Sequence, residues 1–167
     1  MYDELTKQDI AKMQEEIDYR VQQLRPKLIE DVQTARAFGD LSENYEYKTA
    51  KQELNRNKSR IRYLEQMIKT AHVISDHSTA GTVGLYDRVT VYMEEDDEEQ
   101  IIQVVTTVRT DPRQGLISKE SPFGKAVLGA KEGDRVTVRV SDDYSYVCEI
   151  RHIEKGADDG SAPILQY

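Results

Sequence analysis

Residues that break helices are almost absent from the first 80 positions of the chain. This part contains one glycine, Gly39, and one proline, Pro26, whereas the other eight glycines and three prolines all come later. Its apolar residues recur at steps of three and four, which places them along one face of a helix. The first stripe consists of Ile10, Met13, Ile17, Val21, Leu24, Leu28, Val32 and Ala35, and the second of Tyr47, Ala50, Leu54, Asn57, Ile61, Leu64, Ile68 and Ala71. Both stripes match the a and d positions of heptads, and they predict two helices of about 30 residues each.

Only the turn at Gly39 separates the two predicted helices, so they are expected to fold back on each other as an antiparallel coiled-coil hairpin over residues 1–75. Charge supports this pairing, because residues 1–47 carry 6 basic and 11 acidic side chains, net -5, whereas residues 48–75 carry 7 and 2, net +5. Pro26 is expected to remove one backbone hydrogen bond and bend the first helix. Asn57 in the seam is expected to fix the register at a cost in stability.

The second half of the chain has the composition of a small sheet. Its β-branched and aromatic segments are bounded by Gly, Pro and Asp clusters and predict four or five strands. These segments are 88–92, 101–108, 135–140 and 144–153. Ser121 followed by Pro122 predicts a short helix that stops at Gly129. The fold class is therefore α+β.

Three polar segments of this half are interpreted as connections. Residues 76–81 are expected to form a linker between the hairpin and a sheet domain over residues 82–154. The acidic run at residues 94–99 is interpreted as a solvated turn between two strands. Residues 155–167 are expected to be a disordered tail.

The overall charge argues against a protein that grips duplex DNA by itself. The chain of 167 residues has a net charge of -8, and residues 76–167, with 10 basic and 18 acidic side chains, account for all of it. Affinity for a duplex comes mainly from Lys and Arg that neutralise phosphates. The lone Cys148 excludes an internal disulfide, and no zinc-finger spacing is present. Apolar runs are too short to span a bilayer and no signal peptide is visible, so the expected location is the cytoplasm, with no membrane partner.

Carboxylates gather at the turn of the hairpin. Asp40 and Glu43 are three residues apart, which places both on one side of a helix start, within reach of one hard cation. Such a pair can hold Mg²⁺ and orient a metal-bound water. The same spacing also fits a capping box at the start of the second helix, and spacing alone favours the cap. Two or three carboxylates make a weak Mg²⁺ site, so the missing ligands would have to come from a partner.

The residues around this turn resemble those of a known family. The segment Gly39-Asp40-Leu41-Ser42-Glu43-Asn44, with Glu46-Tyr47 and then Ala50-Lys51, is similar to the tip of the Gre family of bacterial transcript cleavage factors. In the second half, Leu116-Ile117-Ser118, Ser121-Pro122 and Leu128-Gly129 are similar to the same family. The resemblance covers about residues 5–154.

This resemblance implies a fold and a partner. Gre factors place an FKBP-like C-terminal domain at the mouth of the secondary channel of RNA polymerase and thread the coiled coil inward. The tip acids then reach the active centre of a backtracked complex, where the nascent RNA 3′ end lies. The resemblance implies that the polymerase performs the cleavage, and that the chain is an accessory factor with no cofactor of its own.

The resemblance also implies roles for single residues. Asp40 and Glu43 match the acids that help to retain a second Mg²⁺, held jointly with the polymerase, and to position the attacking water. Ser42, Asn44, Tyr45 and Glu46 would support the tip. Many members carry a small residue where this chain has Tyr45, whose ring could stack on a nucleotide or crowd the active centre.

Two further groups are candidates for contacts with the polymerase complex. Glu120, Ser121 and Pro122 match the region of the family that faces the polymerase, and would contact a coiled coil at the channel rim; the same residues equally suit a plain helix start. Arg36, Lys48 and Lys51 could contact phosphates of the extruded RNA. The alternative for these three is an ordinary solvated or seam-flanking charge, which is the commoner case.

Three functions follow from these patterns. The leading hypothesis is a factor that stimulates cleavage of backtracked RNA and so rescues arrested polymerase. A second is an inhibitor that occupies the same channel without cleavage, because acidic tips occur in inhibitory paralogues too. A third, from another class, is a peptidyl-prolyl isomerase or chaperone; it ranks low because residues 81–154 offer only Phe123 and scattered tyrosines for an aromatic pocket.

Overall fold

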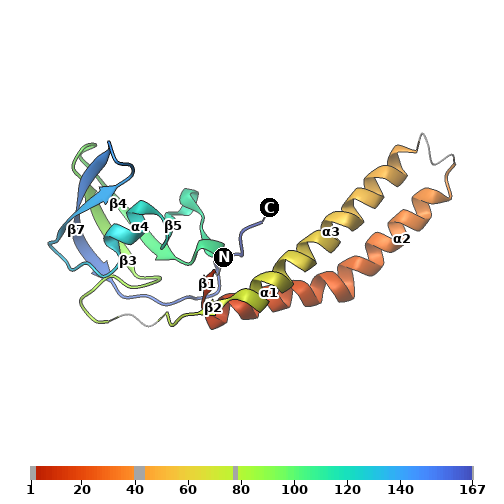
Figure 1. Cartoon of the computed structure of the whole chain (residues 1–167), viewed down its shortest axis with the longest axis horizontal. Coiled ribbons are helices and arrows are strands. Elements are labelled where there is room, and N and C mark those ends of the chain that lie inside the picture. The colour runs from red at the N-terminus through yellow and green to blue at the C-terminus, as the bar shows by residue number, and fades with distance from the viewer. Residues whose placement is uncertain (1–2, 40–43, 77–78, 167) are drawn as a thin grey trace. The chain divides into compact units, whose positions relative to one another are not determined.

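The computed structural model describes residues 3–39, 44–76 and 79–166 (Figure 1). The chain divides into two compact units. The first, here called the arm unit, comprises residues 1–3 and 10–71, and the second, the sheet unit, comprises residues 4–9 and 72–167. The sheet unit thus takes in two segments that the sequence places with the hairpin, 4–9 and 72–75.

A two-stranded parallel sheet explains these boundaries. Strand β1 (Glu4–Leu5) pairs with β2 (His72–Val73), and the backbone N–H of Ile74 donates to the carbonyl of Leu5 at 2.9 Å. Two segments far apart in the sequence are therefore hydrogen-bonded to each other, because each offers the other a free strand edge. This short sheet is absent from the sequence prediction.

The arm unit is the predicted antiparallel helical hairpin. Its first side is α1 (Lys7–Tyr19), η1 (Arg20–Leu24) and α2 (Arg25–Arg36), and its second side is α3 (Tyr45–Thr70). None of the sixteen predicted seam residues is exposed, and Figure 1 shows α2 beside α3. Apolar residues at three- and four-residue steps can leave water together only when the two stripes face each other, so the predicted hairpin is confirmed.

Pro26 changes the helix type rather than ending the helix. The five residues 20–24 form a π-helix, in which the N–H of Arg25 reaches back to the carbonyl of Arg20, and Pro26 lies in the first turn of α2. Proline lacks an N–H, and in an unbroken α-helix its ring would strike the carbonyl four residues earlier. The wider π turn just before Pro26 accommodates the ring and lets the seam continue into α2.

Asn57 forms a polar layer in the seam, opposite this π-helix. Its side chain is 3% exposed; its Oδ1 accepts from Arg20 Nη1 at 3.0 Å, and its Nδ2 donates to the Arg20 carbonyl at 3.2 Å. One turn on, the guanidinium of Arg60 makes two hydrogen bonds with the carboxylate of Glu16, at 2.8 and 3.2 Å. A slip of the two helices would leave these groups without partners, which is the arrangement expected of a layer that favours one register.

The main sheet of the second unit has the strand order β5-β4-β3-β7-β6. Its strands are β3 (Arg88–Met93), β4 (Glu98–Val105), β5 (Leu116–Ser118), β6 (Arg135–Arg139) and β7 (Ser145–Glu154). Neighbouring strands are antiparallel except β4 and β5, and β3 carries a bulge against β7 between Thr90 and Val91. The four predicted strands are confirmed, and the turn between β3 and β4 lies within the acidic run 94–99 as predicted.

Alternation along the strands builds one core. Val89, Val91, Val104, Val138, Cys148 and Ile150 are fully buried. Helix α4 (Pro122–Val127) adds Val127 to the same cluster, and Ser121 caps its start with Pro122 in the first turn, as predicted. The predicted strand at 101–108 is wrong at its end, because residues 107–109 form the 3₁₀ turn η2 (Thr107–Arg109). A second such turn, η3 (Pro112–Gln114), precedes β5.

The C-terminal segment, residues 156–166, packs on the sheet unit instead of forming the expected disordered tail. Ala162 and Ile164 are buried, and the N–H of Leu165 donates to the carbonyl of Val108 at 2.6 Å. Asp158 is buried too, and its Oδ1 accepts from Arg109 Nη2 at 2.5 Å. A buried guanidinium needs a carboxylate partner, and this requirement holds a segment that is poor in apolar residues.

Within the described residues, no helix combines the length and the apolar character that crossing a membrane requires.

Candidate functional site

The closed end of the hairpin is tied together by Asn44. As N-cap of α3, Asn44 accepts through Oδ1 from the N–H of Tyr47 at 3.0 Å. Its Nδ2 donates to the carbonyl of Ala35, in the last turn of α2, at 2.6 Å. The same carbonyl also accepts from the N–H of Phe38 at 3.2 Å. One side chain therefore satisfies backbone groups at both helix ends and links the end of α2 to the start of α3.

Cationic side chains lie against tyrosine rings beside this end. The guanidinium of Arg36 lies 5.7 Å from the centroid of the Tyr47 ring, and Lys51 Nζ lies 5.9 Å from it. Lys48 Nζ lies 5.8 Å from the ring of Tyr45. We call these five residues the tip stack. It brings together all three predicted RNA-contacting residues, and it combines positive charge with aromatic faces, the two features that bind single-stranded nucleic acid.

Exposed aromatic rings distinguish the end of the arm from the rest of the hairpin. Tyr45 is 82% exposed and Phe38 is 74% exposed, the two largest values among the large hydrophobic residues of the described part of the chain. The predicted site includes Tyr45 but omits Phe38. An aromatic residue directly before the only glycine of the first 80 positions is the signal that could have identified it.

The predicted catalytic and metal-holding residues, Asp40 and Glu43, lie outside the described residues, as does Ser42. The structure does settle which residue caps the second helix. Since α3 begins at Tyr45 with Asn44 as its cap, the expected capping box at Asp40 and Glu43 does not start this helix, and that interpretation is wrong. Asn44 prevails because its amide can accept from α3 and donate to α2 at once, which a carboxylate cannot do.

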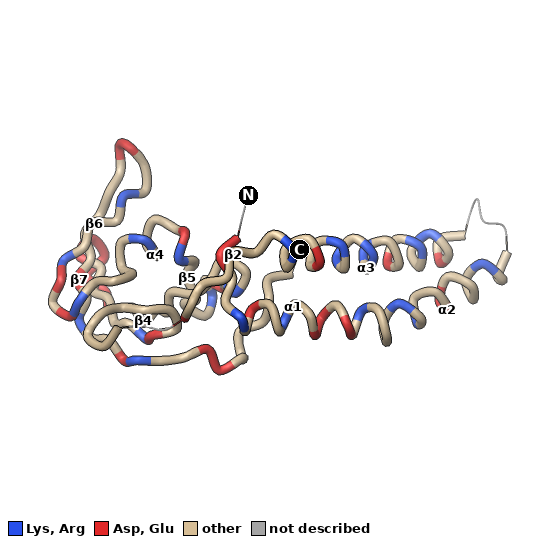
Figure 2. Tube along the Cα trace, turned by 60° about the horizontal axis from the view of Figure 1, so that its bottom comes forward, with Lys and Arg blue, Asp and Glu red and all other residues tan. Residues whose placement is uncertain are grey.

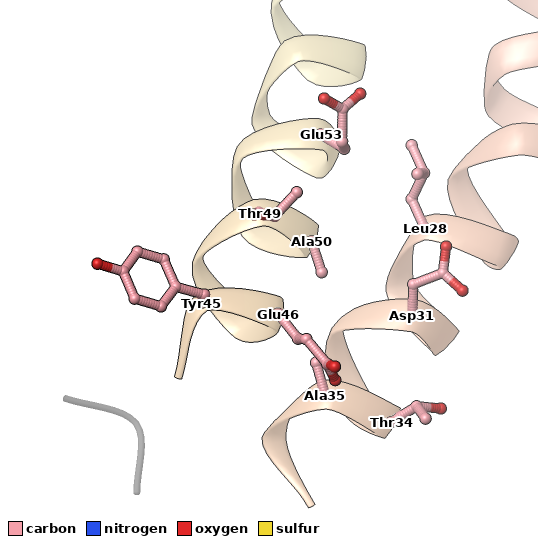
Figure 3. Close-up of a pocket in the computed structure, with 9 residues that line it drawn as sticks. All are labelled: Leu28, Asp31, Thr34, Ala35, Tyr45, Glu46, Thr49, Ala50 and Glu53. Atoms are coloured by element: carbon pink, nitrogen blue, oxygen red, sulfur yellow. The ribbon is translucent and has the colours of Figure 1, made fainter. Parts of the chain in front are cut away.

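The remaining tip residue, Glu46, makes none of the contacts that define the tip stack. It lines a groove between α2 and α3 together with Asp31 and Glu53 (Figure 3). Figure 2 shows that acidic and basic residues both recur along the hairpin, with basic residues prominent on α3. In the parts that the structure describes, no three His, Cys, Asp or Glu side chains gather closely enough to hold a metal ion.

The predicted polymerase-binding residues surround the start of α4 in the sheet unit. Ser121 Oγ accepts from the N–H of Gly124 at 3.0 Å and donates to the carbonyl of Ser118 at 2.7 Å, and Pro122 takes the first helical position. A Cβ at Gly124 would lie 2.0 Å from that same carbonyl, so only glycine fits there. The helix start is therefore rigid, and it presents Glu120 and Pro122 to solvent.

Lys119 links this helix start to the N-terminal strand. Its ammonium group pairs with Glu4 and with Glu120, the latter at 2.9 Å. Burial lowers the pKa of Lys119, but the hydrogen bonds to the two carboxylates outweigh burial and the net pKa is raised. The hydrogen bond from Lys119 lowers the pKa of Glu120. Glu120 is therefore held as a carboxylate on the surface.

Comparisons with protein-family models and with individual proteins find the same family. The model for the N-terminal domain of the GreA/GreB transcription elongation factors matches residues 4–73, and the model for the GreA/GreB C-terminal domain matches residues 77–155. Transcription elongation factor GreA of Oenococcus oeni is 38% identical over 152 residues, which cover 90% of this chain and 94% of that protein. GreA of Geobacillus kaustophilus is 40% identical over 136 residues, covering 81% and 86%.

A solved structure is similar to nearly the whole length of this chain. The transcription factor Gfh1 matches 93% of this chain and 99% of its own, with a TM-score of 0.45 and 22% sequence identity.

Proposed function

The chain belongs to the GreA/GreB family of transcription elongation factors, and we propose that it acts in the bacterial cytoplasm as a transcript cleavage factor for RNA polymerase. In this proposal the hairpin enters the secondary channel of the polymerase. Asp40 and Glu43 then reach the active centre of a backtracked complex, and the polymerase hydrolyses its own misplaced RNA 3′ end. The chain is an accessory factor in this reaction, and its partners are the polymerase and the nascent RNA.

The observation that supports this proposal most directly is the way Asn44 closes the hairpin. The segment that joins α2 to α3 carries both acids, and its flanking residues are held by the hydrogen bonds of Asn44 to Ala35 and Tyr47. Ala35 in the last turn of α2 and Tyr47 in the first turn of α3 are thereby joined through one side chain. The hairpin therefore brings its two helix ends together on either side of the segment that carries the two acids.

The chemistry of two carboxylates fits an accessory role. Mg²⁺ prefers six oxygen ligands, so a pair of side chains holds it only weakly and a shared site with the polymerase would be needed. A Mg²⁺ ion bound there would polarise the attacking water. The task of Asp40 and Glu43 is then to supply two of the ligands and to orient that water.

In this proposal the residues of the tip stack contact the RNA. Arg36, Lys48 and Lys51 are already positioned by the rings of Tyr45 and Tyr47, so they can meet the phosphates of the extruded RNA with little further ordering. The exposed ring of Tyr45 can stack on a base of the same RNA. On the sheet unit, the rigid start of α4 with Glu120, Ser121 and Pro122 would contact the rim of the channel.

A cleavage assay tests the proposal. The protein is added to purified backtracked elongation complexes with Mg²⁺, and the RNA is followed on a gel. We expect shortened transcripts that can be extended again, and about 10²-fold slower cleavage with Asp40→Asn or Glu43→Gln at unchanged affinity for the polymerase.

Glu30→Gln, an exposed carboxylate of α2, is the matched control and should cleave normally. Full cleavage by the Asp40→Asn and Glu43→Gln double variant would overturn the role of the acids. Slower synthesis without short RNA would instead identify an inhibitor of the channel.

A further inference from the structure

A groove of about 490 Å³ lies between α2 and α3 near the closed end of the arm unit (Figure 3). We call it the hairpin groove. Its lining residues are Leu28, Asp31, Thr34, Ala35, Tyr45, Glu46, Thr49, Ala50 and Glu53. It lies within one unit of the molecule, and of the predicted site residues it involves only Tyr45 and Glu46, both expected to support the tip.

The sequence creates this groove by placing small residues in the seam. Ala35 and Ala50 occupy seam positions of the two helices, where most other positions carry Leu, Ile or Val. Helices that pack through a seam keep their axes about 8–10 Å apart, so two alanines cannot fill the space that larger residues fill elsewhere. Leu28 and the two alanines leave an apolar floor that is open to solvent.

Carboxylates surround this floor. Glu46 and Glu53 are seven residues apart on α3, with Ala50 between them, and Asp31 contributes a third carboxylate from α2 (Figure 3). In the described part of the chain, Glu53 pairs with Arg56 at 2.8 Å across exposed side chains, whereas no ion pair involves Asp31 or Glu46. Arg36 and Lys51, on the same two helices, lie against the ring of Tyr47.

A floor of methyl groups with a carboxylate rim selects the chemistry of its occupant. A lysine or arginine side chain can lay its aliphatic stem on apolar surface and keep its charged head outside. Arg in particular makes paired hydrogen bonds with carboxylates. Nucleic acid is disfavoured, because three carboxylates repel phosphate.

We propose that the hairpin groove binds a lysine- or arginine-bearing segment of RNA polymerase and so fixes how the arm is rotated about its own axis. This inference rests on the proposed function, because it takes the polymerase as the partner that surrounds the arm. The two surfaces would then bind partners of opposite charge. The acidic groove would contact a basic segment of protein, and the basic tip stack would contact RNA.

Charge reversal in the groove tests the proposal. Affinity for core RNA polymerase is measured by competition with a labelled copy of the wild-type protein. Asp31→Lys and Glu46→Lys should each weaken binding about tenfold, and the double variant by more. The matched control is Glu30→Lys, which makes the same charge change on the same helix outside the groove and should alter affinity less than twofold. Circular dichroism shows whether each variant remains helical.

A photo-crosslinking amino acid in place of Thr49 identifies the occupant. We expect a crosslink to a polymerase peptide that contains Lys or Arg, and reversal of that residue to Glu should restore the binding of Asp31→Lys. A crosslink to RNA or to a second copy of this chain would overturn the proposal, as would equal losses in Asp31→Lys and Glu30→Lys. If wild type binds and cleaves while the groove variants bind equally well, only this inference fails; if wild type does not bind polymerase, the proposed function fails as well.

Discussion

In the sheet unit, Arg109 is completely buried and lies between Asp9 and Asp158, at 3.6 and 2.5 Å. At the closed end of the arm unit, Arg36, Lys48 and Lys51 lie instead against tyrosine rings, with their own side chains exposed. The two regions use the same kind of residue at opposite extremes of burial. The buried charges are paired with each other inside the protein, whereas those at the end of the arm keep most of their capacity for a partner.

This difference in the burial of charged residues explains why the sheet unit is the more rigid of the two units. Asp9 also accepts from the hydroxyl of Thr106 at 2.8 Å, so the buried cluster joins a residue near the N-terminus, the turn after β4 and the C-terminal segment. Removing Arg109 leaves two buried carboxylates without their counter-charge, which is strongly destabilising. The tip stack has no such dependence, because water can replace each of its contacts.

Removing the guanidinium of Arg109 should have the largest effect. Arg109→Met leaves Asp9 and Asp158 as buried carboxylates without their counter-charge, and we expect a loss of about 3–5 kcal/mol in the free energy of unfolding of the sheet unit. Urea unfolding measures the loss, and hydrogen exchange assigns it to the sheet unit.

Arg135→Met is the matched control for this prediction. Arg135 makes two hydrogen bonds with Glu94, at 2.7 and 2.8 Å, but both side chains lie at the surface. This substitution should leave the unfolding midpoint nearly unchanged. Similar losses from the two variants would show that burial does not distinguish the pairs, and the comparison between the units would lose its basis.

A change at Asn44 should have an intermediate and local effect. Asn44→Ala removes the cap of α3 and the bond to the Ala35 carbonyl, and we expect a loss of about 1 kcal/mol at the end of the arm. Amide exchange of residues 45–48 should then be about fivefold faster, while exchange in the sheet unit stays the same.

Asn44→Asp separates the two bonds of this residue. It keeps an acceptor for the N–H of Tyr47 but has no donor for Ala35, so exchange should quicken in the last turn of α2 and not in α3. If Asn44→Ala instead loosened the sheet unit, the two regions could not be treated as independent.

The hairpin could be predicted from the sequence because its seam repeats at one period over many turns, and Asn57 already interrupted that stripe as a polar layer should. The π-helix before Pro26 could not, since the pattern shows where a proline disturbs a helix but not which helix type accommodates it. The hairpin groove was equally hidden. Ala35 and Ala50 fit the apolar stripe, and only the three-dimensional packing shows that they leave space between the helices.

The location of the candidate site along the chain could be predicted from the sequence, but the contacts between its residues could not. Spacing alone favoured Asp40 and Glu43 as a cap, but Asn44 takes that role because it bonds to both helix ends. The C-terminal segment has the composition of a disordered tail, and only the partner that Arg109 needs reveals why it is ordered. Contacts between residues far apart in the sequence are set by burial, which local patterns do not record.

Cys148 is expected to have the smallest effect on stability at neutral pH. At high pH its ionisation distinguishes the interior of the sheet unit from the surface of the arm unit. Burial, aided by the charge of Glu94, raises the pKa of this thiol to about 11. A raised pKa means that the folded sheet unit favours the neutral thiol, so its contribution to stability is complete below the unfolded pKa and is lost as the pH rises toward about 11. The free energy of unfolding of Cys148→Ala should therefore depend less on pH between about 9 and 11 than that of the wild type.

Iodoacetamide labelling measures how accessible this thiol is. At pH 8 the reagent should label Cys148 far more slowly in the native protein than in urea. A cysteine placed at the exposed position of Tyr45 provides the comparison in the arm unit and should react at the rate of a free thiol. Equal labelling rates at the two positions would show that the interior of the sheet unit opens as readily as the surface of the arm.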